Sequence, residues 1–138
     1  CGGTLTASAA VRPTAGGHGL TLRQARQIAV LVAHHDRIDL SDTHLELNSM
    51  DLSASFVPGF YSFIIIQESS TPGPDETLRK YAISRRTGDV WEMTLCRHYD
   101  FPELTRMRRA IGRAGAAGAV AEQGRQLGCA VHQGKPAA

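Results

Sequence analysis

The hydrophobic positions of the chain follow a helical spacing first, then a strand spacing, and then a helical spacing again. Thr21, followed three residues later by Gln24, matches a capping box that would begin a helix after Leu20. Apolar residues then recur at helical spacing as far as His35, namely Ala25, Ile28, Ala29 and Val32. We therefore predict an amphipathic helix of about four turns that ends near His35-Asp36.

Patterns typical of strands follow. Residues 43–52 alternate between apolar and polar, which predicts a half-buried strand. Residues 60–68 are rich in β-branched and aromatic side chains on both faces, and such a strand is normally central and covered on both sides. Residues 78–86 and 89–97 predict two further strands, joined at Thr87-Gly88, where glycine supplies a positive φ.

A second helical pattern begins at Asp100-Phe101-Pro102-Glu103 and carries the apolar stripe Leu104, Met107 and Ile111. Gly112, Gly115 and Gly118 disfavour a continuous helix, so we expect a break there and a resumption over 119–127. The predicted fold class is α+β. Its N-terminal helix packs on a four-stranded antiparallel meander, and the C-terminal helix covers the other face or an edge.

Length and composition are consistent with one domain. The chain has 138 residues, which suffices for one hydrophobic core, and we assign residues 20–129 to a single α+β domain. Residues 1–19 are rich in Gly, Ala, Ser and Thr and are expected to form a flexible tether, with a disordered tail over 130–138. The net charge of +2 is too small to indicate nucleic acid as a partner. The longest strongly apolar stretch, 63–66, is far shorter than the roughly 20 residues that span a bilayer.

The cysteines bear on location. The start Cys1-Gly2-Gly3-Thr4 resembles the mature end of bacterial lipoproteins, in which a signal peptide is removed and the cysteine receives lipid such as palmitate. This resemblance implies a lipid anchor at Cys1 and a place on the periplasmic side of the cell envelope, at the outer membrane rather than the inner one. Acylation of Cys1 leaves Cys96 and Cys129 as a natural disulfide pair, which would contribute roughly 3–4 kcal/mol. The alternatives are an unrelated chain boundary and two free thiols in a cytosolic protein.

Motifs of catalysis and of metal binding are missing from the sequence. The densest polar cluster, His34-His35-Asp36 with Asp39, Asp42 and His44, has no HExxH or paired CxxC spacing, so we predict no metal site. Cys96 and His98 would share a strand face, but a disulfide would remove that nucleophile. There is also no GxSxG, Walker or GxGxxG motif. We predict a protein without enzymatic activity and without a cofactor.

Basic residues gather near the one tryptophan of the chain. Arg79, Arg85, Arg86 and Arg97 lie close in sequence to Trp91. We expect these five residues to form a binding surface for an acidic protein or an anionic envelope polymer. The alternative is a solvated basic face above a buried tryptophan.

The hairpin sequence over 81–92, YAISRRTGDVWE, is similar to a hairpin of small exported bacterial α+β modules of PepSY-like, cystatin-like and NTF2-like type, which include inhibitors and toxin-immunity proteins. With the lipoprotein resemblance, it implies a non-enzymatic, lipid-anchored envelope protein that binds a protein or an envelope component, with inhibition or immunity as one version. The alternative is a small-ligand carrier or hydrolase-like enzyme with a cavity between helix and sheet. A homodimer through the second apolar face of 60–66 is a further prediction.

Overall fold

A computed structural model describes residues 19–50, 57–112 and 119–129 of the chain. The predicted tail and nearly all of the predicted tether lie outside the described residues. None of the described helices is both long enough and apolar enough to cross a membrane. The described elements, in chain order, are α2 (Leu22–His35), β1 (Leu45–Ser49), β2 (Phe60–Gln67), β3 (Glu76–Ser84), β4 (Val90–Glu92), β5 (Arg97–His98), α3 (Pro102–Ile111) and α4 (Ala119–Gln126).

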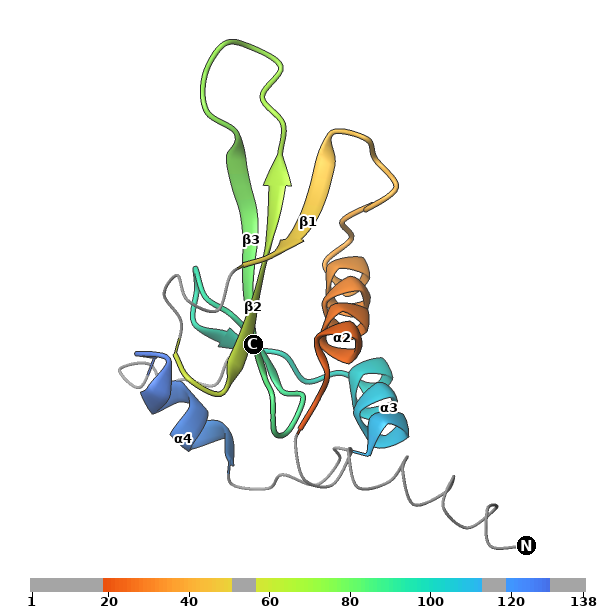
Figure 1. The fold of residues 1–138 in the computed structure, drawn as a ribbon, viewed down its shortest axis with the longest axis vertical. Helices are drawn as coiled ribbons and strands as arrows, with labels where there is room; N and C mark the ends of the chain where they lie inside the picture. The colour runs from red at the N-terminus through yellow and green to blue at the C-terminus, as the bar shows by residue number, and fades with distance from the viewer. Residues whose placement is uncertain (1–18, 51–56, 113–118, 130–138) are drawn as a thin grey trace, which may run out of the picture.

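The strands form one antiparallel sheet in the order β1-β2-β3-β4-β5, so each strand pairs with its neighbour in the sequence. Helices α2 and α3 lie on one side of this sheet, and α4 lies on the other side (Figure 1). The predicted α+β class and the meander are therefore confirmed. The β2–β3 hairpin extends beyond the neighbouring strands and ends in a projecting loop (Figure 1).

The prediction of four strands is wrong, because the strand expected over 89–97 is divided into β4 and β5. The backbone reverses direction between them, so that Trp91 pairs with His98 and Glu92 pairs with Arg97. Cys96 adopts a positive φ of 52° in this turn, and the Leu95 N–H donates to the Glu92 carboxylate at 3.0 Å. The alternation of polar and apolar residues does not reveal this turn, because the turn is closed by the buried Glu92 side chain and not by a typical turn sequence.

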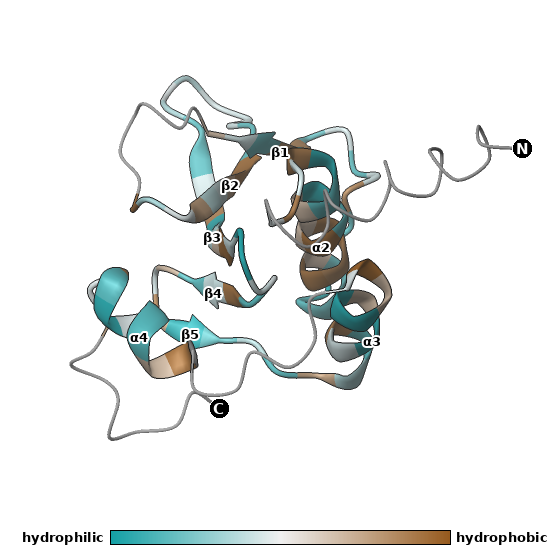
Figure 2. Ribbon diagram, turned by 60° about the horizontal axis from the view of Figure 1, so that its bottom comes forward, coloured by the Kyte–Doolittle hydropathy of each residue, from teal (hydrophilic) through white to brown (hydrophobic). Residues whose placement is uncertain are grey.

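Helix α2 is anchored by its first turn and by its apolar side. The Thr21 hydroxyl accepts from the Gln24 N–H at 3.1 Å, and the Gln24 side chain accepts from the Thr21 N–H at 2.9 Å, which completes the predicted capping box. Ile28 and Val32 are fully buried against the sheet, and burial of each contributes roughly 1.5–3 kcal/mol. The hydropathy colouring shows α2 with an apolar and a polar side, beside a largely apolar β2 (Figure 2). The main core is a single cluster that includes Leu20, Ala25, Leu47, Phe63, Ile65, Tyr81, Ile83, Val90 and Leu104.

The opposite face of the sheet is covered more unevenly. At one end, α4 and the Cys96–Cys129 disulfide enclose a smaller cluster that includes Phe60, Ala82 and Trp91. Farther along the same face of β2, Ile64 and Ile66 are only half-buried. The sequence led us to expect β2 to be covered on both faces, and the structure shows full burial on the α2 side and partial burial on this one.

The break in the C-terminal helical pattern is confirmed. Helix α3 ends at Ile111, and its C-cap, Gly112, adopts a left-handed φ of 92°, a conformation that glycine enters without a steric penalty. Helix α4 then begins at Ala119. The interruption allows α3 to pack beside α2 while α4 reaches the other side of the sheet (Figure 1).

Candidate functional site

The five residues expected to form a basic surface lie in three different environments. Trp91 is buried, with 7% of its surface exposed, and its indole N–H donates to Gln123 Oε1 at 3.0 Å. Arg79 and Arg97 are half-buried on the α2 side of the sheet, next to Asp36 and Tyr99 respectively. Arg85 and Arg86 are exposed at the β3–β4 turn, where Arg85 lies 5.1 Å from the Tyr61 ring centre. The structure does not bring all five side chains into one patch.

Asp36, the residue that caps the C-terminal end of α2, is the centre of one buried polar cluster. Its Oδ2 accepts from the Tyr81 hydroxyl at 2.8 Å, the Tyr99 hydroxyl at 2.6 Å and Arg79 Nε at 3.3 Å. Burial, followed by the hydrogen bond to the Asp36 carboxylate, raises the pKa of both tyrosines well above the usual range. Both phenols therefore stay protonated donors. The cluster fixes the position from which the chain leaves α2 for β1.

Asp89 is the centre of a second buried cluster. One carboxylate oxygen accepts from Thr87 Oγ1 at 2.6 Å and Gln123 Nε2 at 3.0 Å, and the other lies 3.2 Å from His98 Nε2 and 3.4 Å from Arg108 Nη1. Burial alone raises the pKa of Asp89, but the hydrogen bonds from His98, Thr87 and Gln123 and the charge of Arg108 outweigh it and lower the pKa to about 2. These contacts join the β3–β4 turn, β5, α3 and α4.

Neither cluster has the features of a catalytic centre. Each buried carboxylate is already surrounded by donors from several elements, which is the arrangement of a structural hydrogen-bond network. Cys96 is bonded to Cys129 and is not a free nucleophile. Within the ranges that the structure describes, no group of three or more His, Cys, Asp or Glu side chains could hold a metal ion.

A surface groove lies between the end of α2 and the start of α3. Its volume is about 710 Å³, and its lining includes His34, His35, Phe101 and Glu103. The His35 ring stacks on Phe101 with ring centres 3.8 Å apart, so this histidine packs against an aromatic ring. The space directly between α2 and the sheet, where a ligand cavity was the alternative prediction, is filled by fully buried side chains such as Ile28, Val32 and Phe63.

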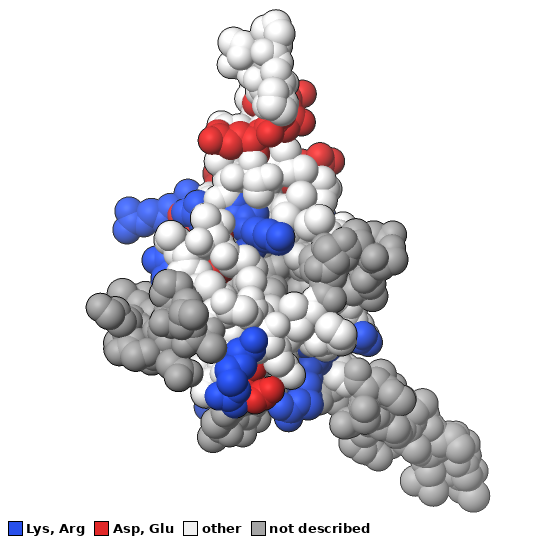
Figure 3. Space-filling model, turned by 90° about the vertical axis from the view of Figure 1, so that its left-hand side faces the viewer, with Lys and Arg blue, Asp and Glu red and all other residues white. Residues whose placement is uncertain are grey.

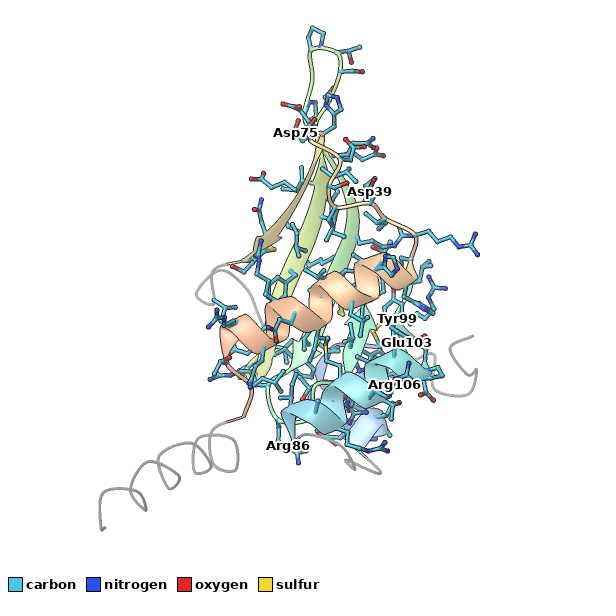
Figure 4. The ribbon with its side chains drawn as sticks, turned by 90° about the vertical axis from the view of Figure 1, so that its right-hand side faces the viewer. Asp39, Asp75, Arg86, Tyr99, Glu103 and Arg106 are labelled. Atoms are coloured by element: carbon cyan, nitrogen blue, oxygen red, sulfur yellow. A yellow bond between two sulfur atoms is a disulfide. The ribbon has the colours of Figure 1, made fainter. Side chains whose placement is uncertain are left out.

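The end of the molecule that contains the β2–β3 loop is strongly acidic. Figure 3 shows a band of acidic side chains below the tip of this loop. Figure 4 places Asp39 and Asp75 toward this end, and Arg86 and Arg106 toward the opposite one. Residues 38–50 and 64–78 contain no Lys or Arg. We call their six exposed carboxylates the acidic end; they are Asp39, Asp42, Glu46, Glu68, Asp75 and Glu76.

Local hydrogen bonds shape the loops of the acidic end. Asp39 Oδ1 accepts from the Ser41 N–H and hydroxyl, and the Ser41 hydroxyl, followed by the Ser41 N–H, lowers the pKa of this carboxyl. Asp75 Oδ1 accepts from the Ser69 N–H at 3.0 Å across the β2–β3 loop. His44 Nδ1 lies 3.3 Å from Glu68 Oε1. Among the described residues, the other five carboxylates of the acidic end form no ion pair within 4.0 Å.

A hollow opens between the acidic end and the half-buried part of β2. Its volume is about 260 Å³, and its lining consists of Thr43, His44, Leu45, Glu46, Ile66, Glu68 and Asp75. Glu46 is paired directly across from Ile66 in the β1–β2 ladder, so both side chains point to the face that α2 does not cover. The apolar side chain of Ile66 therefore lies next to the Glu46 carboxylate on this face.

Sequence reasoning did not identify this acidic end. Asp39, Asp42 and His44 were considered as metal ligands, whereas Glu46, Glu68, Asp75 and Glu76 were not considered. The available signal was the complete lack of Lys and Arg in two segments of a chain whose net charge is +2. Antiparallel pairing of β1 with β2 then brings the two segments together.

Comparison with known proteins found one family model and a solved structure that resemble this chain. Residues 37–79 match the family model "Effector immunity protein Tgi2PP". A chain from a solved type VI secretion system effector–immunity complex of Pseudomonas protegens is 28% identical, with a TM-score of 0.69, and the match covers 80% of this chain and 91% of that one. No protein of curated function matches the sequence. Neither match is to a PepSY-like, cystatin-like or NTF2-like module, and both agree with a protein-binding role.

Proposed function

We propose that this protein is an immunity protein, which binds and neutralises a toxic effector delivered by a type VI secretion system. The observation that carries the proposal is the match of residues 37–79 to an effector immunity protein. The similarity to a chain of an effector–immunity complex, over 80% of the sequence, supports the same function. In this function the protein acts by binding and catalyses no reaction.

The interior of the protein supports a binding role over an enzymatic one. The interface between α2 and the sheet is packed with apolar side chains, and the buried carboxylates of Asp36 and Asp89 are occupied by protein donors. Charged and apolar side chains remain accessible at the end of the sheet. Surfaces of this type recognise proteins by complementarity of shape and charge.

We also propose that the protein works in the cell envelope, on its periplasmic side. The Cys96–Cys129 disulfide supports this location, because disulfides persist in oxidising compartments and are rare in the cytosol. Lipid attachment at Cys1 remains part of the proposal. Labelling the full-length precursor with a fatty acid in cells should tag the wild type and not a Cys1→Ser variant, and an unlabelled wild type would contradict the anchor.

The immunity function is tested by competition between strains. A host strain that lacks both this gene and the gene of its cognate effector should be killed on solid medium by its parental strain, and a plasmid copy of the gene should restore survival. The control attacker is a parental strain whose type VI secretion system is inactivated, which should not kill. Equal survival of the deletion strain and the wild type against the active attacker would refute the proposed function.

A further inference from the structure

We propose that the effector docks on the acidic end, and that a Lys or Arg side chain of the effector enters the hollow beside Ile66. This inference rests on the proposed function and adds the surface and the chemistry of the partner. The docking surface comprises the six carboxylates of the acidic end and the two half-buried isoleucines of β2, Ile64 and Ile66. The complementary partner is a protein with a basic patch.

The charge distribution gives the first reason. Six of the thirteen acidic residues of the chain lie in residues 38–50 and 64–78, without one Lys or Arg. Asp39 and Asp75 hold their loops through local hydrogen bonds, but like charges gathered at one end of the molecule also repel one another. The charge networks that do stabilise the fold are elsewhere and are buried, around Asp36 and Asp89. A basic partner would relieve the repulsion.

The shape and polarity of the hollow give the second reason. Ile66 lines it on the face of β2 that α2 does not cover, together with the carboxylates of Glu46, Glu68 and Asp75, and Thr43, His44 and Leu45 complete the lining. Lys and Arg have an apolar stem and a cationic head, and they bury the stem while the head stays close to charge or water. A hollow that places the apolar Ile66 side chain beside three carboxylates therefore fits such a side chain. Lys80, which is paired directly across from Ile64, marks where the acidic surface ends.

The docking surface also lies inside the segment on which the proposed function rests. Residues 37–79, which match an effector immunity protein, include all six carboxylates and both isoleucines. The exposed arginines of the opposite end, such as Arg86 and Arg109, lie outside the matched segment. A second copy of this chain is a poor occupant, because two acidic ends would face each other and repel.

The experiment compares charge reversal at the two ends of the molecule. The test variant carries Glu46→Lys and Glu68→Lys, and the matched control carries Arg106→Glu and Arg109→Glu; all four side chains are exposed. A milder variant with Glu46→Gln and Glu68→Gln covers the case in which the double lysine variant fails to fold. Circular dichroism and thermal unfolding establish that each variant is folded.

The probe is the effector itself, identified as the secreted protein whose deletion from the parental attacker abolishes killing of the unprotected strain. We expect the affinity for this effector to fall by about tenfold or more in the lysine variant, mainly through a slower association rate, and less in the glutamine variant. The affinity of the wild type should also decrease as NaCl rises from about 50 to 500 mM. The arginine control should bind within about twofold of the wild type.

Two results would overturn the docking inference. In the first, the folded acidic-end variants bind the effector as tightly as the wild type does. In the second, the arginine control loses more affinity for the effector than the acidic-end variants lose. Both results would leave the proposed function intact, because the wild-type chain would still bind the effector and protect cells. Failure of the competition assay with the wild-type chain would instead refute the proposed function.

Discussion

Replacement of Asp89 by Asn should destabilise the fold, and the size of the effect should depend on pH. The Asp89 side chain is 5% exposed and is bound by Thr87, Gln123, His98 and Arg108. Its pKa falls from an ordinary value of 3.8 to about 2, and each unit corresponds to about 1.4 kcal/mol. The lowered pKa thus corresponds to a contribution of about 2.5 kcal/mol to the free energy of unfolding at neutral pH.

The sign follows from the lowered pKa. A carboxyl that is more acidic in the folded state than in the unfolded state stabilises the fold fully above its unfolded pKa, which is near 4. This contribution is lost as the pH falls from about 5 through the folded pKa of about 2. At pH 7 the Asp89→Asn variant should be less stable by about 3 kcal/mol, because Arg108 also loses a buried partner. At pH 2 the difference should shrink by about 2 kcal/mol.

The assay is urea unfolding followed by the fluorescence of Trp91, which is the one tryptophan of the chain and is buried in the fold. Measurements at pH 7, 5, 4, 3 and 2 give the free energy of unfolding of both proteins. The matched control is Asp100→Asn, an exposed carboxylate, for which we expect a change of less than about 0.5 kcal/mol. A constant difference between wild type and Asp89→Asn from pH 7 to pH 2 would refute the reasoning.

Two further predictions concern the covalent and polar links between elements. Cys129→Ser should lower the free energy of unfolding by about 3–4 kcal/mol, because the disulfide closes a sequence separation of 33 residues. The wild type, unfolded by urea in the presence of a thiol reductant, should lose the same free energy. A urea midpoint that is the same for Cys129→Ser and the wild type would contradict this prediction. Tyr99→Phe should cost about 1–2 kcal/mol by removing the 2.6 Å hydrogen bond to Asp36. The control is Tyr61→Phe, which removes the hydrogen bond from the Tyr61 hydroxyl to the Leu20 carbonyl. In an Asp36→Ala background, Tyr99→Phe should lower the free energy of unfolding by less than it does in the wild type, whereas the effect of Tyr61→Phe should stay the same.

Local signals in the sequence determined most of the helical structure. The Thr21–Gln24 capping box and the apolar spacing of α2 lie within one or two helical turns, so the sequence alone contains the interactions that begin and bury this helix. The interruption between α3 and α4 was also readable, since Gly112 adopts the left-handed conformation that glycine favours. The order of strands in the sheet followed from short connections, which favour pairing of sequence neighbours.

Tertiary contacts decided the features on which the proposed function depends. Trp91 is close to four arginines in sequence, yet it packs beneath α4 with Phe60 and Cys129, and Gln123, 32 residues later, accepts from its indole N–H. The strand predicted over 89–97 became a turn and two short strands, since Glu92 closes the reversal with its own side chain. The acidic end likewise exists because β1 and β2 pair, which places Glu46 beside Ile66. The sequence by itself determined which residues are charged, and the antiparallel pairing decided which charges share a surface, because that depends on contacts between residues far apart in the chain.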